Sequence, residues 1–100
     1  MHYLLIYDLA DDYLERRPAF RSEHLALAWQ HADDGRLLLA GALDAPADTA
    51  VLVFTGDSPS AAEAFANADP YVVNGLVKHW RVRPWNTVVG RLAASPVRPG

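Results

Sequence analysis

Short runs of branched and aromatic residues alternate with helix-like segments, and this order is the feature that most limits the fold. Residues 2–8, 36–41, 50–55 and 76–85 have the composition of strands. Residues 19–34 contain neither glycine nor proline and predict a helix, as do residues 61–68. The order β-α-β-β-α-β predicts an α+β, ferredoxin-like protomer, with two helices on one face of a four-stranded antiparallel sheet.

Breakers mark the ends of the first helix. Residues 11–17 are polar and charged and predict a loop or irregular turn, and Pro18 suits an early helical position. Gly35 stands where a left-handed residue ends a helix. One apolar stripe, about a hundred degrees wide, should pack on the sheet; it contains Leu25, Ala28, Trp29 and Ala32.

The second half of the chain also contains residues that mark turns and helix ends. Residues 44–48 carry turn chemistry and predict a hairpin between the second and third strands. Ser58-Pro59 suits the start of the second helix, and Ser60 with Glu63 offers an alternative capping box. Pro70 interrupts that helix at Asp69, since the residue before proline avoids the α region.

Three of the predicted strands are apolar on both faces. Consecutive residues of a strand point to opposite sides, so large hydrophobic side chains would also stand on the face without helices. The runs are Tyr3 to Tyr7, Leu37 to Leu39 and Val51 to Phe54. We expect a second copy to cover this face, forming a homodimer with a dimeric α/β barrel. The alternatives are a third layer made by the tail, or simple exposure of these residues.

Composition limits the class of protein. One hundred residues make one domain, and the absence of cysteine excludes a disulfide framework, a thiolate zinc site or a cysteine nucleophile. The net charge of −3 argues against a nucleic-acid partner, and no apolar run is long enough for a membrane span. Without a signal-peptide pattern, a cytoplasmic protein is expected. We expect residues 1–90 to form the domain and residues 91–100 a mobile tail.

One histidine and one arginine on the first helix are candidates for a catalytic or binding role. His24 lies about 90° from the centre of the apolar stripe, at the rim of the sheet-facing side, and Arg21 lies one turn earlier. Together they offer an imidazole that titrates near neutral pH and a cation that can hold a carboxylate. The alternative is a surface helix in which Arg21 pairs with Asp or Glu.

Asp69-Pro70-Tyr71 is the second candidate, at the break after the second helix. An aspartate that accepts a hydrogen bond from His24 would fix the imidazole tautomer and raise its basicity. The alternative is that Asp69 only caps the short turn that follows. Nothing local brings residue 69 to residue 24, so both interpretations stay open. His31, Asp33 and Asp34 are better explained as a solvated helix end than as a metal site.

Several short motifs occur together in a characteristic order. They are the strand Tyr3 to Tyr7, Leu14-Glu15-Arg16-Arg17, Arg21-x-x-His24-Leu25, Asp34-Gly35-Arg36-Leu37-Leu38 with Ala40-Gly41, Asp69-Pro70-Tyr71, Gly75, and Arg83-Pro84-Trp85. In this order the chain resembles the YciI-like (YCII-related) family of small dimeric α/β-barrel proteins, over about residues 1–88. The resemblance implies a ferredoxin-like dimer and a His-Asp active site, which falls on His24 and Asp69. Arg21 matches the family's arginine, whereas Ala42 replaces a usual proline.

Three hypotheses follow for the function. The first is an enzyme without cofactor or metal that acts on a small anionic molecule by lyase, isomerase or dehalogenase-like chemistry. Its catalytic residues would be His24 and Asp69, and Arg21 and Tyr71 would bind the substrate. The second is a non-catalytic dimeric domain that binds a metabolite or serves as an accessory module. The third is a purely structural dimer, which predicts that His24 and Asp69 lie far apart with no pocket between them.

Overall fold

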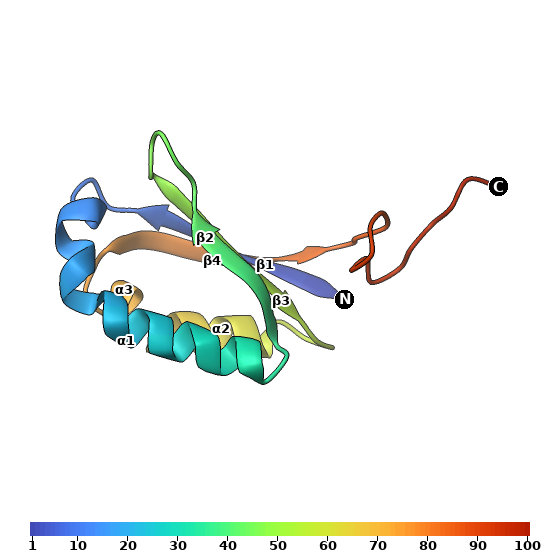
Figure 1. Ribbon diagram of the computed structural model, residues 1–100, viewed down its shortest axis with the longest axis horizontal. Coiled ribbons are helices and arrows are strands. Elements are labelled where there is room, and N and C mark those ends of the chain that lie inside the picture. Colours follow the sequence, from blue (N-terminus) through green and yellow to red (C-terminus); the bar gives the residue numbers. More distant parts are fainter.

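Four strands form one antiparallel sheet, with three helices together on one side of it (Figure 1). The structure is a computed structural model that describes residues 1–100. Its elements are β1 (His2–Leu9), α1 (Tyr13–Asp33), β2 (Leu37–Ala42), β3 (Thr49–Thr55), α2 (Ser60–Ala68), α3 (Pro70–Val73) and β4 (Val77–Trp85). The strand order β2-β3-β1-β4 confirms the predicted ferredoxin-like α+β fold.

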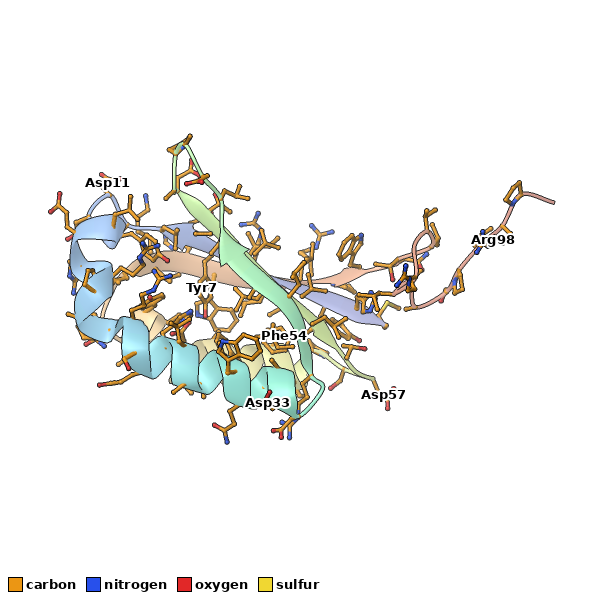
Figure 2. All side chains as sticks on the ribbon, in the orientation of Figure 1. Tyr7, Asp11, Asp33, Phe54, Asp57 and Arg98 are labelled. Atoms are coloured by element: carbon orange, nitrogen blue, oxygen red, sulfur yellow. The ribbon has the colours of Figure 1, made fainter.

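The core lies between the sheet and the helices. In the central strand β1, alternate residues face the helices and are buried: Tyr3, Leu5, Tyr7 and Leu9. Leu52 and Phe54 of β3 pair with Leu5 and Tyr3 and extend this layer. Phe65 and Ala66 of α2 close it from the other side and are fully buried. Figure 2 shows Tyr7 and Phe54 pointing from the sheet toward the helices.

The prediction of a loop or irregular turn at residues 11–17 holds for Asp11 and Asp12 and is wrong from Tyr13 onward, where α1 already begins. Pro18 therefore lies inside the helix rather than near its start. Contacts distant in sequence hold this first part in place: Tyr13 packs edge-on against Tyr71, with ring centroids 5.6 Å apart, and Arg16 donates a hydrogen bond to the Asn74 carbonyl oxygen. The first part of α1 runs at an angle to the rest (Figure 1), as a proline without its N–H allows.

The packed side of α1 also differs from the predicted stripe. Beyond Tyr13, the α1 residues that contact the core are Phe20, His24, Leu27, Ala28, His31 and Ala32. Ala28 and Ala32 of the predicted stripe thus pack as expected, whereas Leu25 and Trp29 do not. This side is rotated by about a quarter turn from the predicted one. Leu25 and Trp29 remain exposed, Trp29 to 63 % of its surface. The two histidines fit the interior because Asp69 and neighbouring aromatic rings contact them. No helix of the fold combines the length and apolar character that a membrane span requires.

Turns and helix ends match the sequence more closely. Gly35 and Gly75 both follow helices with positive φ, of 80° and 77°, and the β2–β3 hairpin is present. The helix α2 covers Ser60–Ala68, one residue more at its start than the predicted 61–68, and its N-cap residue Pro59 offers no side-chain hydrogen bond. Ser58 Oγ accepts a hydrogen bond from the Ser60 amide. The Ser60 and Glu63 capping box is not formed.

The face of the sheet away from the helices, here called the outer face, carries apolar residues from three strands. The strand pairing places Leu39, Val53 and Leu4 in one row across β2, β3 and β1, and Ile6 and Val51 in the next. Leu39 is 74 % exposed.

The residues that follow β4 contact the first residue of β1. Thr87 Oγ1 lies 2.7 Å from His2 Nδ1 and accepts a hydrogen bond from the Ala94 amide. The Val97 amide donates to the Val88 carbonyl oxygen. The mobility expected for residues 91–100 remains a prediction.

Candidate active site

Asp69 connects α2 and α3 and is fully buried. Its Oδ1 accepts hydrogen bonds from the Tyr71 amide, at 3.0 Å, and from His24 Nδ1, at 2.7 Å. Its Oδ2 accepts from the Tyr7 hydroxyl, also at 2.7 Å. The sequence left open whether Asp69 caps α3 or contacts His24. In the structure the same carboxylate does both.

His24 stacks on Tyr71, with ring centroids 3.9 Å apart and planes 9° from parallel. Its side chain is 17 % exposed. An ionised carboxylate only accepts hydrogen bonds, so the neutral imidazole carries its proton on Nδ1 and leaves the Nε2 lone pair free. Nε2 makes no hydrogen bond within the chain, and it is not among the buried atoms that lack a partner. The ring is therefore oriented by its buried side and open on the other.

The two tyrosines beside Asp69 are held in their neutral form. Burial, reinforced by the neighbouring Asp69 carboxylate, raises the pKa of Tyr7 far above its ordinary range. Burial also raises the pKa of Tyr71 to about 12, and Tyr13 acts in the same direction. Both hydroxyls thus remain protonated near neutral pH, and Tyr7 serves as a hydrogen-bond donor to Asp69.

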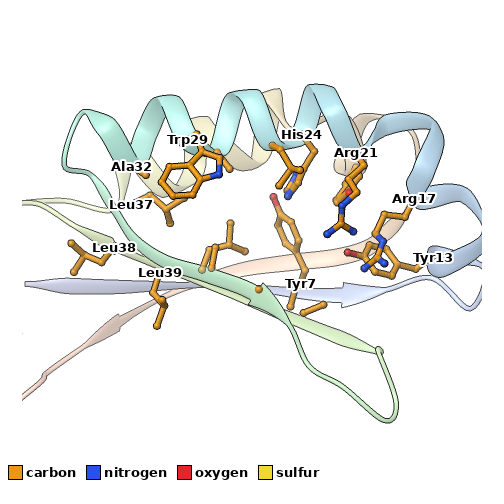
Figure 3. A pocket seen from close by; sticks show the side chains of 18 residues that line it. Tyr7, Tyr13, Arg17, Arg21, His24, Trp29, Ala32, Leu37, Leu38 and Leu39 are labelled. Carbon is orange, nitrogen blue, oxygen red and sulfur yellow. The ribbon is translucent and has the colours of Figure 1, made fainter.

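A cavity of about 340 Å³ opens between α1 and β2 (Figure 3). Tyr7, His24 and Tyr71 line it, while Asp69 lies behind them and does not. Arg17 and Arg21 also line it, and no Asp or Glu does. The remaining lining residues are Tyr13, Leu25, Ala28, Trp29, Ala32, Leu37, Leu38, Leu39, Ala40, Gly41, Ala42, Ala50 and Leu52. The cavity is therefore positively charged where it meets His24.

Neither cavity arginine forms an ion pair within the chain. The arginines that do so are Arg16, Arg36 and Arg81. This contradicts the alternative in which Arg21 pairs with a surface carboxylate. The separation of His24 from Asp69 expected for a purely structural dimer is wrong as well, since the two side chains are in contact beside a cavity.

The sequence analysis missed three polar residues of the cavity: Tyr7, Tyr13 and Arg17. Tyr7 was assigned only to a strand, and Arg17 and Tyr13 to a loop or its margin. A helix extended back through Pro18 would have placed Arg17 one turn before Arg21, on the same side. The partnership of Tyr7 with Asp69 spans 62 residues and has no local signal.

His31 lies on the packed side of α1, away from these groups. Its ring is edge-on to Phe65, at 5.3 Å, and its Nδ1 is buried without a partner. Burial lowers the pKa of His31, and Arg36 adds to the effect. The solvated helix end expected there is thus wrong for His31. No three His, Asp or Glu side chains gather closely enough to hold a metal ion.

Comparison with known proteins identifies the family. The model of the YCII-related domain matches residues 1–86. The chain belongs to the YCII-related family. Protein YciI of Escherichia coli O6:H1 and that of Shigella flexneri are each 41 % identical to it over 86 residues, covering 77 % of this chain and 88 % of theirs.

A solved structure shares the fold of this YCII-related domain. It is 5-chloro-2-hydroxyhydroquinone dehydrochlorinase from Burkholderia phenoliruptrix AC1100, in complex with 2,5-dihydroxybenzoquinone. The TM-score is 0.72, and the match covers 87 % of this chain and 95 % of that one. The identity is 19 %, so the likeness shows a shared fold.

Proposed function

We propose that this chain is a cofactor-independent enzyme that transfers protons on a small anionic molecule, with His24 as general acid and base. The observation that carries the proposal is the 2.7 Å hydrogen bond between His24 Nδ1 and the buried Asp69 carboxylate, beside a cavity that holds two unpaired arginines. A histidine anchored in this way has one nitrogen fixed and one available for the substrate.

The chemistry follows from the free nitrogen. Nε2 takes a proton from a C–H or O–H group of the substrate, and the electron pair left behind forms a new double bond. In an isomerisation, the imidazolium returns the proton to another atom of the same molecule. In an elimination, a leaving group departs with its bonding electrons. Asp69 stabilises the imidazolium through Nδ1–H throughout, and Tyr7 keeps Asp69 in position.

Arg21 and Tyr71 are the proposed substrate-binding residues. Arg21 lines the cavity one turn before His24 and has no carboxylate partner, so its guanidinium is free to bind an anion. Tyr71 stacks on His24 and fixes the plane of the imidazole. The dehydrochlorinase with the same fold binds a small planar quinone bearing acidic hydroxyls. By analogy, a compact anion whose charge develops near His24 suits this cavity.

Exchange in heavy water tests the proposal. A panel of lactones, unsaturated carboxylic acids and chlorinated hydroquinones is incubated with the protein in D2O, and conversion or deuterium uptake is followed by NMR. For a panel member that reacts, His24→Gln should lower the rate by about 10²–10⁴-fold. Glu23→Gln, at an exposed position of α1 outside the cavity, is the matched control and should leave the rate unchanged.

Two results would count against the enzyme. An unchanged rate in His24→Gln would remove histidine from the chemistry. Saturable binding without any exchange or conversion across the panel would favour the alternative, a dimeric metabolite-binding or accessory domain.

We also propose that the outer face joins two copies in a homodimer. Its rows of apolar residues on β1, β2 and β3 lie on the side of the sheet opposite the helices, and Leu39 is 74 % exposed there. Leaving Leu39, Val53 and their neighbours in water would forgo several kcal/mol at about 25 cal/mol per Å². A two-fold pairing would bury the same patch on both copies.

A further inference from the structure

The cavity beside His24 has two chemically different ends. Figure 3 shows Arg17, Arg21 and Tyr13 at one end, and Trp29, Ala32 and Leu37 at the other, with His24 and Tyr7 between them. An anion alone would need only the first end. The second end, with Trp29, Ala32 and Leu37, offers an apolar surface to the rest of a ligand.

The apolar end is built mainly from α1 and β2. The stripe predicted to pack on the sheet, Leu25, Ala28, Trp29 and Ala32, lines this cavity in full. The β2 lining residues Ala40, Gly41 and Ala42 are small, and Ala40 and Ala42 pair with the inward-facing Leu52 and Ala50, which leaves room between the strand and the helix. Trp29 is 63 % exposed at the same time as it lines the cavity. Such an arrangement offers an apolar trough with an aromatic wall, as small-molecule sites commonly do.

The helix orders these groups along one line. Arg21 and His24 are three residues apart, which is a rise of about 4.5 Å, and Ala28 follows after about 6 Å more. A ligand whose anionic group contacts Arg21 therefore presents atoms a few bonds away to His24. Its remaining atoms then reach the apolar end.

We propose that the site takes amphipathic carboxylates: molecules with a carboxylate at Arg17 and Arg21 and an aromatic or branched aliphatic group against Trp29 and β2. The proton that His24 transfers then belongs to a carbon between the two, near the α or β position. This last point rests on the proposed function, whereas the ligand class rests on the cavity alone.

The test is a calorimetric titration with three probes: 4-phenylbutanoate, butanoate and 4-phenylbutanamide. The first has both groups, the second lacks the aromatic ring, and the third lacks the charge. We expect 4-phenylbutanoate to bind about tenfold or more tightly than either of the others. Equal binding of the first two would overturn the apolar subsite, and equal binding of the first and third would overturn the carboxylate site.

Variants locate the two ends. Ala40→Leu fills the trough from an exposed strand position and should weaken 4-phenylbutanoate about tenfold while sparing butanoate. Ala64→Leu places the same side chain on the exposed side of α2 and should change neither. The double variant Arg17→Gln with Arg21→Gln should weaken both acids about tenfold or more, and Arg98→Gln neither. An unchanged affinity of Ala40→Leu for 4-phenylbutanoate, or an equal loss of affinity for both acids, would contradict the proposed apolar subsite.

The outcome is separable from that of the enzyme proposal. His24→Gln should keep 4-phenylbutanoate affinity within about threefold, since neither ligand end contacts His24 in this assignment. If the probe series behaves as expected but no panel member exchanges protons, the ligand class stands and the catalytic role fails. If proton exchange is found but the three probes bind equally, the catalytic role stands and the proposed ligand class fails.

Discussion

Replacing Asp69 by alanine should destabilise the fold more than any other single change of a charged residue. The carboxylate accepts three hydrogen bonds, from the Tyr7 hydroxyl, the Tyr71 amide and His24 Nδ1. Tyr7 and Tyr71 are only 1 % and 3 % exposed, so water cannot easily replace the lost acceptor. Each buried donor left without a partner costs about 1–3 kcal/mol, which gives about 2–6 kcal/mol for the two.

Asp69→Asn separates charge from hydrogen bonding. The amide keeps one acceptor oxygen, which can still cap α3 at the Tyr71 amide, and its NH2 can donate to the Tyr7 oxygen. We therefore expect about half the loss seen with alanine. Asp57→Ala, at an exposed position in the turn before α2, is the control and should change stability by less than about 0.5 kcal/mol.

Urea denaturation followed by circular dichroism measures these differences, provided that the slope of free energy against urea is the same in all variants. A domain of this size has about 5–15 kcal/mol in total. A loss of about 2–6 kcal/mol would therefore remove from about an eighth of the stability to all of it. An alanine variant as stable as the parent would refute the reasoning. It would mean that the cost of burying the carboxylate cancels its three hydrogen bonds.

Three further predictions concern other parts of the molecule. Because the pKa of Tyr71 is about 12 in the fold against 10.0 in the unfolded chain, stability should fall as pH rises from 10 towards 12, and Tyr71→Phe should lessen that fall in denaturation curves. Val53→Asp, on the outer face, should convert a dimer into a monomer in sedimentation runs at micromolar concentration, whereas Val73→Asp, exposed on α3, should not; a monomeric parent chain would contradict the dimer. Gly75→Ala should lose about 1–2 kcal/mol on thermal unfolding because φ is 77°, and Gly41→Ala should lose little; equal effects would count against a conformational cause.

The local parts of the fold followed from local signals. Strand composition, the glycines after α1 and α3 and the proline after Asp69 were enough to place the elements and their order. The first two turns of α1 were not predictable in the same way. Pro18 signals a helix start, whereas the residues before it are held by contacts distant in sequence, Tyr13 with Tyr71 and Arg16 with the Asn74 carbonyl oxygen.

The sequence indicated the residue types of the candidate site but not how they are arranged. The spacing of Arg21 and His24 was readable because both lie on one helix. The contact of His24 with Asp69 crosses 45 residues, so the residues alone left it open and the family resemblance favoured it. The orientation of α1 was misjudged because periodicity treats every apolar stripe as core. Here the stripe with Trp29 lines the cavity, while the packed side includes two histidines that Asp69 and the phenylalanine rings accommodate.

The imidazole nitrogen spectrum of His24 tests the central claim most directly. In long-range 1H–15N spectra of the neutral ring, Nδ1 should carry the proton and Nε2 should not, and addition of 4-phenylbutanoate should shift Nε2 while Nδ1 stays protonated. A neutral ring protonated on Nε2, or an Nε2 signal that is indifferent to every bound anion, would contradict a histidine that Asp69 orients toward the ligand.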